Sequence, residues 1–242
     1  MNRLKFSIVT PSFNQGKYIR KTIESVIDQN YENFEHIIID GGSTDETLEI
    51  LKNYPHLKWI SEKDRGQANA INKGFDLASG EIYAWLNSDD YYDNNTFRVV
   101  EEKFQNEKDS QFVYGDIVYV DEQSNYLSQR TGNNLSYEGL VENPDIIRQP
   151  SCFWKKELWN RCGPLDENYF LVMDLDLFLR FGKETDFYYC NNNLSFYRTY
   201  PQTKTLSNLK KQVKEIYRTV KKYEGRIPFQ LKKKLLRRYF GI

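Results

Sequence analysis

The stretch EHIIIDGGSTDE, residues 35–46, decides the fold. Its first part is a short apolar run rich in isoleucine, which is typical of a buried strand. A pair of glycines follows, and Ser43 and Glu46 then have the spacing of a capping box, which predicts a helix through Leu48 and Leu51. A strand that leads directly into a helix is half of a βαβ unit. The stretch therefore predicts an α/β fold with a parallel sheet.

The same alternation of strand and helix continues on both sides of this stretch. Strands are expected at residues 6–10, 57–61 and 82–86, with amphipathic helical patterns between them. Residues 111–120 and 150–154 are further strand candidates. We therefore expect a Rossmann-like, mostly parallel central sheet flanked by helices.

Length and composition favour one α/β domain without a membrane span. The chain has 242 residues, and it contains no run of about 18 apolar residues. Residues 1–5 lead directly into a strand pattern rather than into a signal peptide, so we expect a cytoplasmic protein. The cysteines Cys152, Cys162 and Cys190 lack the paired spacing of a zinc site, and we expect reduced, buried thiols.

Positive charge is concentrated in the last part of the chain. Residues 204–242 contain thirteen Lys and Arg against two Glu, although the whole chain has a net charge of zero. Apolar residues alternate with these basic residues, which predicts an amphipathic helical tail. Such a tail either lies on an anionic membrane surface or packs on the rest of the protein with a solvated basic face. No nucleic-acid-binding motif accompanies the charge, so we expect no nucleic-acid partner.

Polar residues stand at the ends of three predicted strands. They are TPSFN at residues 10–14, DGGS at 40–43 and NSDD at 87–90. Ligands of an open α/β sheet bind beyond the carboxyl ends of its strands, so these segments should converge on one crevice. The adjacent Asp89 and Asp90 repel each other unless a cation or hydrogen-bond donors offset their charge. They either support a Mg²⁺ or Mn²⁺ site, or cap the next helix, or lie in a solvated turn.

These segments resemble glycosyltransferase family 2 in their order and spacing, over roughly residues 5–200. The segments that carry the resemblance are 10–14, 40–45, DRGQANAINKG at 64–74, WLNSDD at 85–90, YGD at 114–116, QPS at 149–151, GPLDE at 163–167 and MDLDL at 173–177. The resemblance implies a GT-A fold, an inverting mechanism and a nucleotide-diphosphate sugar donor, most often UDP-linked.

The resemblance also assigns the donor-binding residues. Thr10, Pro11 and Ser12 would line the base and ribose pocket, and Asp40 would accept a hydrogen bond from the uracil ring. Asn72 falls where the family's loop and helix approach the nucleotide, but its amide could instead satisfy backbone groups. The expected donor-binding residues are Thr10, Pro11, Ser12, Asn14, Asp40, Asp64, Gly66, Gln67, Asn72, Asn87, Ser88, Asp89 and Arg198.

The metal is expected at Asp89. This residue matches the metal-binding third position of the family's Asp-x-Asp motif, whereas Asn87 stands at the first position, which is usually acidic. Asp89 would therefore hold Mn²⁺ or Mg²⁺ with help from the donor's phosphates, and the metal would arrive with the donor. Tyr200 replaces the histidine of the family's Arg-x-His segment. Arg198 and Lys204 either contact the phosphates or are solvated surface residues.

Two aspartates are candidates for the base that deprotonates the acceptor hydroxyl. Asp174 and Asp176 are two residues apart, so on a helix they point about 200° from each other and only one can face the crevice. Asp174 aligns with the family's base, although it could instead cap the helix. Asp176 can pair with Arg180, four residues later. Met173 stands where many relatives have Glu.

The resulting hypothesis is a metal-dependent hexosyl- or N-acetylhexosaminyltransferase of surface-polysaccharide (O-antigen or capsule) synthesis. Its acceptor would be a saccharide or a polyprenyl-diphosphate-linked molecule, met in the cytoplasm or at the inner face of the cytoplasmic membrane. We expect a GT-A domain at 1–203, with a nucleotide-binding half at 1–100 and an acceptor half at 101–203, and a basic tail at 204–242. Two alternatives remain. One is a non-catalytic GT-A-like scaffold that acts through its tail; the other, nucleotidyl transfer, would require a Gly-rich loop near residue 10.

Overall fold

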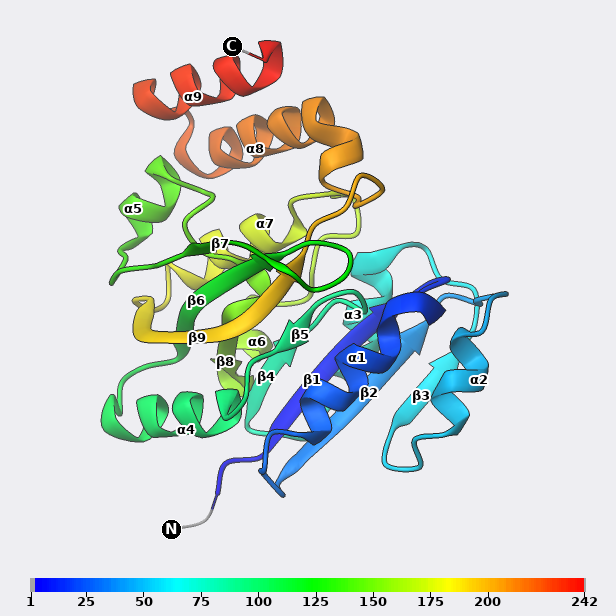
Figure 1. The fold of residues 1–242 in the computed structure, drawn as a ribbon. Helices are drawn as coiled ribbons and strands as arrows, with labels where there is room; N and C mark the ends of the chain where they lie inside the picture. Colours follow the sequence, from blue (N-terminus) through cyan, green and yellow to red (C-terminus); the bar gives the residue numbers. More distant parts are fainter. Residues whose placement is uncertain (1–2, 242) are drawn as a thin grey trace.

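One sheet forms the centre of the molecule, with helices on both of its faces (Figure 1). The structure is a computed structural model that describes residues 3–241. Across this part of the chain the strands lie in the order β3-β2-β1-β4-β8-β6-β9-β5, and β7 pairs with β6. The predicted α/β class with a mostly parallel sheet is confirmed.

The first four strands are parallel and alternate with helices as predicted. The strands are β1 (Phe6–Ser12), β2 (Phe34–Asp40), β3 (Lys58–Ser61) and β4 (Ile82–Trp85), and the helices are α1 (Gly16–Ile27), α2 (Thr47–Lys52) and α3 (Gln67–Asp76). Because β1 lies between β2 and β4, Ser12 pairs with Asp40 and Val9 pairs with Trp85. The polar ends of these three strands therefore lie side by side at one edge of the sheet.

The second half of the sheet mixes strand directions. Its strands are β5 (Tyr91–Tyr92), β6 (Phe112–Val120), β7 (Tyr126–Arg130), β8 (Cys152–Lys155) and β9 (Tyr188–Arg198). β9 runs parallel to β6, whereas β8 runs antiparallel to both β4 and β6. The strand expected at 150–154 begins only at Cys152, because Gln149–Ser151 form a 3-10 turn, η1, that contains a proline.

The capping box expected at the start of α2 is wrong. α2 begins at Thr47, whose backbone N–H donates to Asp45 Oδ1 at 3.0 Å. The Ser43 hydroxyl is used elsewhere, since it donates to Asp40 and accepts from the backbone N–H of Asn14 at 2.7 Å. Ser43 thus ties the ends of β1 and β2 together, and the helix starts one turn later.

The remaining helices cover the second half of the sheet and extend beyond it. They are α4 (Thr96–Asn106), α5 (Tyr137–Glu142), α6 (Lys156–Cys162), α7 (Met173–Phe181), the 3-10 turn η2 (Leu206–Asn208), α8 (Leu209–Glu224) and α9 (Phe229–Phe240). Aromatic side chains fill the core beneath α3, α6 and α7, where Phe112 stacks on Trp154 at a centroid distance of 6.3 Å. All three cysteines are buried and free, as predicted.

The basic tail is helical, and it packs against the rest of the protein. Ile216 of α8 and Leu231 of α9 belong to the same buried cluster as the core aromatics. The carboxylate of Glu215 accepts a hydrogen bond from the backbone N–H of Leu171 at 2.8 Å. α9 lies on the outer side of α8 (Figure 1). Among the helices of residues 3–241, none has the length and apolar character needed to span a membrane.

Asp176 joins α7 to α8 and provides the first test of this packing. Its carboxylate is 1% exposed, and it accepts from Lys222 Nζ at 3.0 Å and from the Tyr223 hydroxyl at 2.9 Å. It also pairs with Arg180 at 3.0 Å, as the four-residue spacing predicted. Asp176 is therefore a structural residue that faces away from the crevice.

We predict that Asp176→Ala lowers the free energy of unfolding by about 3 kcal/mol, because it removes the buried carboxylate that joins Arg180 of α7 to Lys222 and Tyr223 of α8. Urea unfolding followed by circular dichroism measures this change. Asp76→Asn, at an exposed position at the end of α3, is the control and should stay within about 0.5 kcal/mol of the wild type. Equal stability of the two variants would contradict the assigned role of Asp176.

Candidate active site

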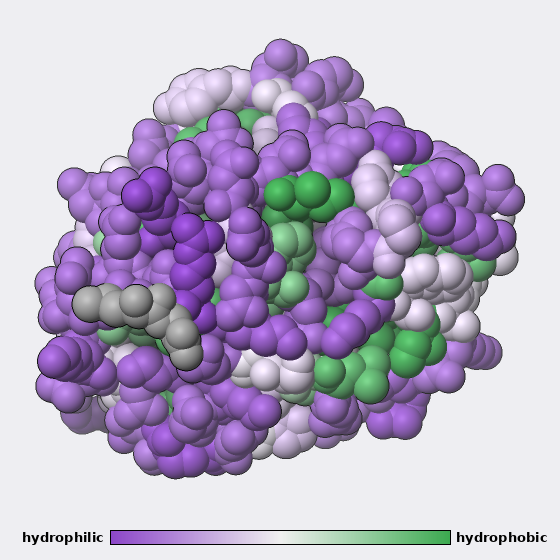
Figure 2. Space-filling view, turned by 90° about the horizontal axis from the view of Figure 1, so that it is seen from below, coloured by the Kyte–Doolittle hydropathy of each residue, from purple (hydrophilic) through white to green (hydrophobic). Residues whose placement is uncertain are grey.

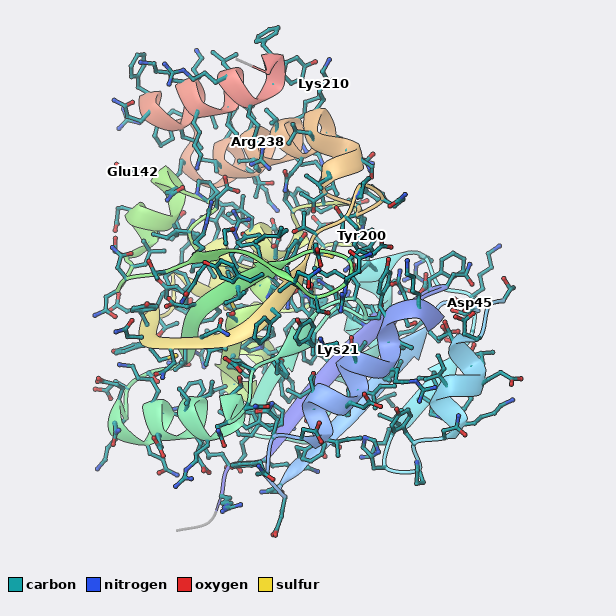
Figure 3. The ribbon with its side chains drawn as sticks, viewed as in Figure 1. Lys21, Asp45, Glu142, Tyr200, Lys210 and Arg238 are labelled. Atoms are coloured by element: carbon teal, nitrogen blue, oxygen red, sulfur yellow. The ribbon has the colours of Figure 1, made fainter. Side chains whose placement is uncertain are left out.

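A cavity of about 600 Å³ opens where β1 and β4 end. Its wall also includes the start of α3, η1, the start of α7 and the segment 199–208 that follows β9. Figure 3 shows Tyr200 of this segment at the junction between the β1–β4 half and the helical end of the molecule. The predicted site residues on the wall are Pro11, Ser12, Asp64, Gly66, Gln67, Asn87, Ser88, Asp89 and Asp174.

Asp40 is predicted to bind the donor, but the structure places it beneath the cavity wall. The side chain is fully buried, and Oδ2 accepts from the backbone N–H of Gly42 at 3.1 Å and of Ser43 at 2.9 Å. The hydroxyls of Ser43 and Ser61 also donate to this carboxylate. Four donors therefore hold the Asp40 carboxylate, three from the loop that follows β2 and one from the end of β3. Its contact with a uracil ring stays a prediction.

Three further predicted residues do not line the cavity and instead connect segments of the chain. The Thr10 hydroxyl contacts His36 Nε2 at 2.8 Å, and burial lowers the pKa of this histidine to about 3. Asn14 Oδ1 accepts from the backbone N–H of Thr44 at 2.8 Å. The amide of Asn72 makes two hydrogen bonds to the backbone of Leu165, at 2.9 and 3.0 Å. The expected alternative for Asn72, satisfaction of backbone groups, is thus observed, but with a distant segment.

The turn that follows β4 is built around a buried Asp90. This residue is 1% exposed; Oδ1 accepts from the backbone N–H of Arg198 at 3.0 Å, and Oδ2 accepts from Asn87 Nδ2 at 3.1 Å. Burial, reinforced by the charge of Asp89, raises the pKa of Asp90 well above its usual range. The alternatives of a solvated turn and of a helix cap are wrong for Asp90, because its carboxylate binds β9.

Asp89 lines the cavity, as Asp90 does, but its carboxylate is held by fewer protein donors. Its Oδ2 accepts from the Tyr200 hydroxyl at 2.9 Å, and its carbonyl accepts from Arg198 Nε at 3.0 Å. Burial raises the pKa of Asp89, and these two donors oppose the shift. The oxygen of the neighbouring Asn87 side chain accepts from Gln67 Nε2 at 2.9 Å. The Asp89 carboxylate thus accepts from Tyr200 on one oxygen, whereas both carboxylate oxygens of Asp90 are bound within the protein.

The arrangement fits a divalent cation that arrives with phosphate. Among the described residues, no group of three or more His, Cys, Asp or Glu side chains forms a ready-made metal cage. Mg²⁺ commonly uses one or two carboxylates together with substrate phosphates and water. Tyr200 is bound to one of the two carboxylate oxygens of Asp89. Asp90 also lines the cavity, but both of its carboxylate oxygens are bound within the protein, so Asp89 is the better candidate for an anionic ligand from the NSDD turn.

Arg198 is buried and holds the acidic turn in place. It is 3% exposed, so the alternative of a solvated surface residue is wrong. Its guanidinium donates to the carbonyls of Asp89 at 3.0 Å and Glu122 at 2.6 Å, and it lies over the rings of Tyr18 and Tyr91. The side chain that was predicted to contact phosphates is thus occupied by protein acceptors, and it does not line the cavity.

Lys204 and Arg148 are the cations on the cavity wall among the residues that the structure describes, and Lys204 lies beside Gln67. Its Nζ donates to Gln67 Oε1 at 2.8 Å and lies 4.2 Å from the centroid of the Phe170 ring. Burial lowers the pKa of Lys204 to about 8, and the nearby Lys211 adds to this effect. The ammonium group is therefore poorly solvated and close to the residues expected to bind the donor.

Asp174 lies in the first turn of α7 and lines the same cavity as Asp89. Burial raises the pKa of its carboxyl, and the charge of Arg148 opposes the shift. Val172 occupies the helix N-cap position, so the alternative that Asp174 caps the helix is wrong. Asp176 is bound on the other side of α7, which leaves Asp174 as the aspartate of this helix that faces the cavity.

Comparisons with known proteins agree with this geometry. The sequence model of the family described as Glycosyl transferase family 2 matches residues 7–162. The chain belongs to glycosyl transferase family 2. A PGL/p-HBAD biosynthesis glycosyltransferase of Mycobacterium bovis (strain BCG / Pasteur 1173P2) is 31% identical over 181 residues, which cover 72% of this chain and 68% of that relative.

Two solved structures show that this family 2 glycosyltransferase has the GT-A fold. TarS 1-349 of S. aureus in complex with UDP has a TM-score of 0.73 at 18% identity, covering 99% of this chain and 72% of TarS. The mannosyltransferase PcManGT of Pyrobaculum calidifontis, in complex with GDP-Man and Mn2+, has a TM-score of 0.67 at 16% identity, covering 99% of this chain and 70% of that protein.

Sequence reasoning missed a chain of polar side chains in this glycosyltransferase. Gln149 of η1 donates to the carbonyl of Trp85 and accepts from Asn87 Nδ2 at 3.3 Å. Asn87 in turn binds Gln67, which binds Lys204. The QPS segment was a signal for Gln149, but nothing in its sequence indicated which side chain it would meet. Gln149 and Gln67 thereby hold the Asn87 side chain, which stands at the first position of the Asp-x-Asp motif.

We predict that Arg198→Lys destabilises the fold by about 2 kcal/mol or more, because a single ammonium group cannot satisfy several carbonyls at once. Thermal unfolding measures the loss. Arg98→Lys makes the same change on the exposed surface of α4 and should leave the melting temperature unchanged. If both variants unfolded at the wild-type temperature, the proposed dependence of the acidic turn on Arg198 would be refuted.

Proposed function

We propose that this glycosyltransferase is an inverting, metal-assisted enzyme that transfers a hexosyl or N-acetylhexosaminyl group from a UDP-sugar. Its acceptor is a saccharide or a polyprenyl-diphosphate-linked molecule of surface-polysaccharide synthesis, such as O-antigen or capsule, met on the cytoplasmic side of the membrane. One observation carries the proposal: Asp89 and Asp174 line a single cavity at the carboxyl ends of the parallel strands.

The donor is proposed to occupy the part of the cavity between β1, α3 and the acidic turn. Pro11, Ser12 and Asp64 form the wall where the nucleotide would lie, and Asp89 would hold Mn²⁺ or Mg²⁺ against the diphosphate. When bound, the cation neutralises charge that develops on the leaving diphosphate. The complexes of TarS with UDP and of PcManGT with GDP-Man and Mn2+ support this class of donor and this cofactor.

Lys204 is proposed to supply a second positive charge to the diphosphate. The acidic turn has Asn87 where the family usually has an acid, and Arg198 is occupied by backbone carbonyls. Lys204 already donates to Gln67, a weaker acceptor than a phosphate oxygen, so its ammonium group can exchange one for the other. This residue thereby compensates for a metal site with a single protein carboxylate.

Asp174 is proposed as the base for the acceptor hydroxyl. Burial raises its pKa above that of an exposed aspartate, which makes its carboxylate a better proton acceptor. The acceptor oxygen would attack the anomeric carbon from the face opposite the diphosphate, and its proton would pass to Asp174. Attack from that face inverts the anomeric configuration.

We predict that the two aspartates separate donor binding from turnover. Asp89→Ala should weaken UDP binding and remove its dependence on Mn²⁺, because the cation loses its protein ligand. Asp174→Asn should bind UDP as the wild type does, but hydrolyse UDP-sugars about 100-fold more slowly or worse. Calorimetry with UDP, with and without Mn²⁺, and release of UDP from a panel of UDP-sugars measure the two effects.

The control is Asp76→Asn, which lies outside the cavity. Full activity of both site variants would refute the assigned roles. Failure of the wild type to bind UDP or another nucleotide diphosphate would instead favour the non-catalytic scaffold.

We predict that Lys204→Gln weakens UDP binding about tenfold or more, since a charge-assisted hydrogen bond is lost. Wild-type affinity should also fall as the pH rises through about 8, because Lys204 then loses its proton. Lys210→Gln, at an exposed position of α8, should have neither effect. Calorimetry between pH 7 and pH 9 is the measurement, and a flat pH profile together with wild-type affinity in Lys204→Gln would remove this residue from the site.

A further inference from the structure

α9 has apolar side chains on two opposite faces, and one of these faces is exposed. Leu231 and Leu235 are buried against the rest of the protein, at 1% and 4% exposure. Phe229 is 76% exposed, Leu236 49% and Phe240 67%. A surface helix normally places its apolar residues toward the core and polar residues outward, so these three large side chains require an explanation.

The exposed apolar residues form a stripe rather than a scatter. Phe229, Leu236 and Phe240 are separated by seven and four residues, which places them on one side of a helix with 3.6 residues per turn. Lys233 falls on the same line, four residues after Phe229. We call Phe229, Leu236 and Phe240 the outer stripe of α9.

The outer stripe continues into a groove between α8 and α9. The groove has a volume of about 410 Å³. Tyr217 of α8, which is 40% exposed, contributes to it. The other lining residues are Val213, Lys214, Lys232, Leu235, Leu236, Tyr239 and Phe240. The apolar surface therefore extends across both helices of the basic tail.

The basic residues of α9 divide into two groups. Lys234 and Arg238 turn toward the protein and pair with Asp145, both at 3.2 Å. Lys232, Lys233 and Arg237 are exposed and flank the outer stripe. α9 contains no acidic residue, so its outward side combines apolar and cationic groups without a negative charge.

This combination selects one kind of partner. A helix with aromatic and leucine side chains between exposed Lys and Arg matches an anionic lipid surface, whose headgroups attract the cations while the boundary region accepts the apolar groups. A second copy of the chain would bring two cationic faces together, which opposes association. Figure 2 views the opposite end of the molecule, which is largely hydrophilic with a few separate hydrophobic patches.

We propose that α9 docks the protein on an anionic bilayer surface. The outer stripe enters the boundary between headgroups and acyl chains, and Lys232, Lys233 and Arg237 contact the lipid phosphates. A contact joins this surface to the active site, because Gln212 of α8 lines the cavity and accepts from Arg238 of α9 at 2.6 Å. Docking would therefore hold the cavity near the bilayer. The use of this position for a lipid-linked acceptor rests on the proposed function, whereas the docking of α9 on the bilayer does not.

Vesicle co-sedimentation tests the docking surface. The full chain is mixed with vesicles of phosphatidylcholine alone or of phosphatidylcholine with phosphatidylglycerol. We expect binding to the anionic vesicles only, and weaker binding as NaCl is raised. The variants Phe229→Ser/Leu236→Ser/Phe240→Ser and Lys232→Glu/Lys233→Glu/Arg237→Glu should each lose affinity, the second by about 100-fold or more.

Matched controls change the same chemistry elsewhere on the surface. Tyr126→Ser/Leu127→Ser alters exposed apolar residues of β7, and Lys52→Glu/Arg98→Glu/Lys108→Glu reverses three exposed charges. Both should bind vesicles as the wild type does. Circular dichroism and UDP calorimetry on every variant separate loss of docking from loss of folding or of donor binding.

Three results would overturn the proposal. They are no binding of the wild type to anionic vesicles, unchanged binding of both α9 variants, and an equal loss of binding in the controls. Light scattering on the wild type tests the alternative partner, a second copy of the chain. A dimer that the serine variant abolishes, without any lipid binding, would identify α9 as a self-association surface. Normal UDP binding in these cases would leave the proposed enzyme function intact.

Discussion

The buried guanidinium of Arg198 is the interaction on which the active site depends. It joins the end of β9 to the acidic turn after β4, two segments more than a hundred residues apart in the sequence. Asp90 completes the connection by accepting from the Arg198 backbone. A cation held by several carbonyl oxygens is costly to bury unless every donor has a partner, so the turn and the strand constrain each other. Asp89 and Asp90, which both line the cavity, are thereby fixed in the turn, and the carboxylate of Asp90 is used inside the protein.

This constraint changes how charge is distributed around the donor. The arginine that sequence similarity assigns to the phosphates is used inside the protein, and a lysine six residues later reaches the cavity instead. The segment that carries Lys204 leads through η2 into α8, so the cavity wall and the basic tail are continuous. The site therefore consists of a part formed by the strand ends and a part carried by the last third of the chain.

Much of the fold could be predicted from the sequence, because the first four strands are short apolar runs bounded by turn residues. β9 could not be predicted in this way. It contains three consecutive asparagines and pairs with β6 through register shifts, so neither alternation nor an apolar run marks it. The capping box failed for a related reason, since the Ser43 hydroxyl meets Asp40 and Asn14 through tertiary contacts that spacing alone does not reveal.

Sequence similarity indicated which segments form the cavity, but it did not indicate which side chains contact one another there. The structure brings Asp89 and Asp174, which similarity singled out, to one cavity, but the roles of Arg198 and Lys204 depend on which side chain turns inward. A crystal structure with UDP and Mn²⁺, with the metal located by its anomalous signal, tests the central claim most directly. The account predicts Mn²⁺ between the diphosphate and Asp89, with Lys204 against a phosphate oxygen. UDP bound outside this cavity, or Mn²⁺ bound without Asp89, would contradict it.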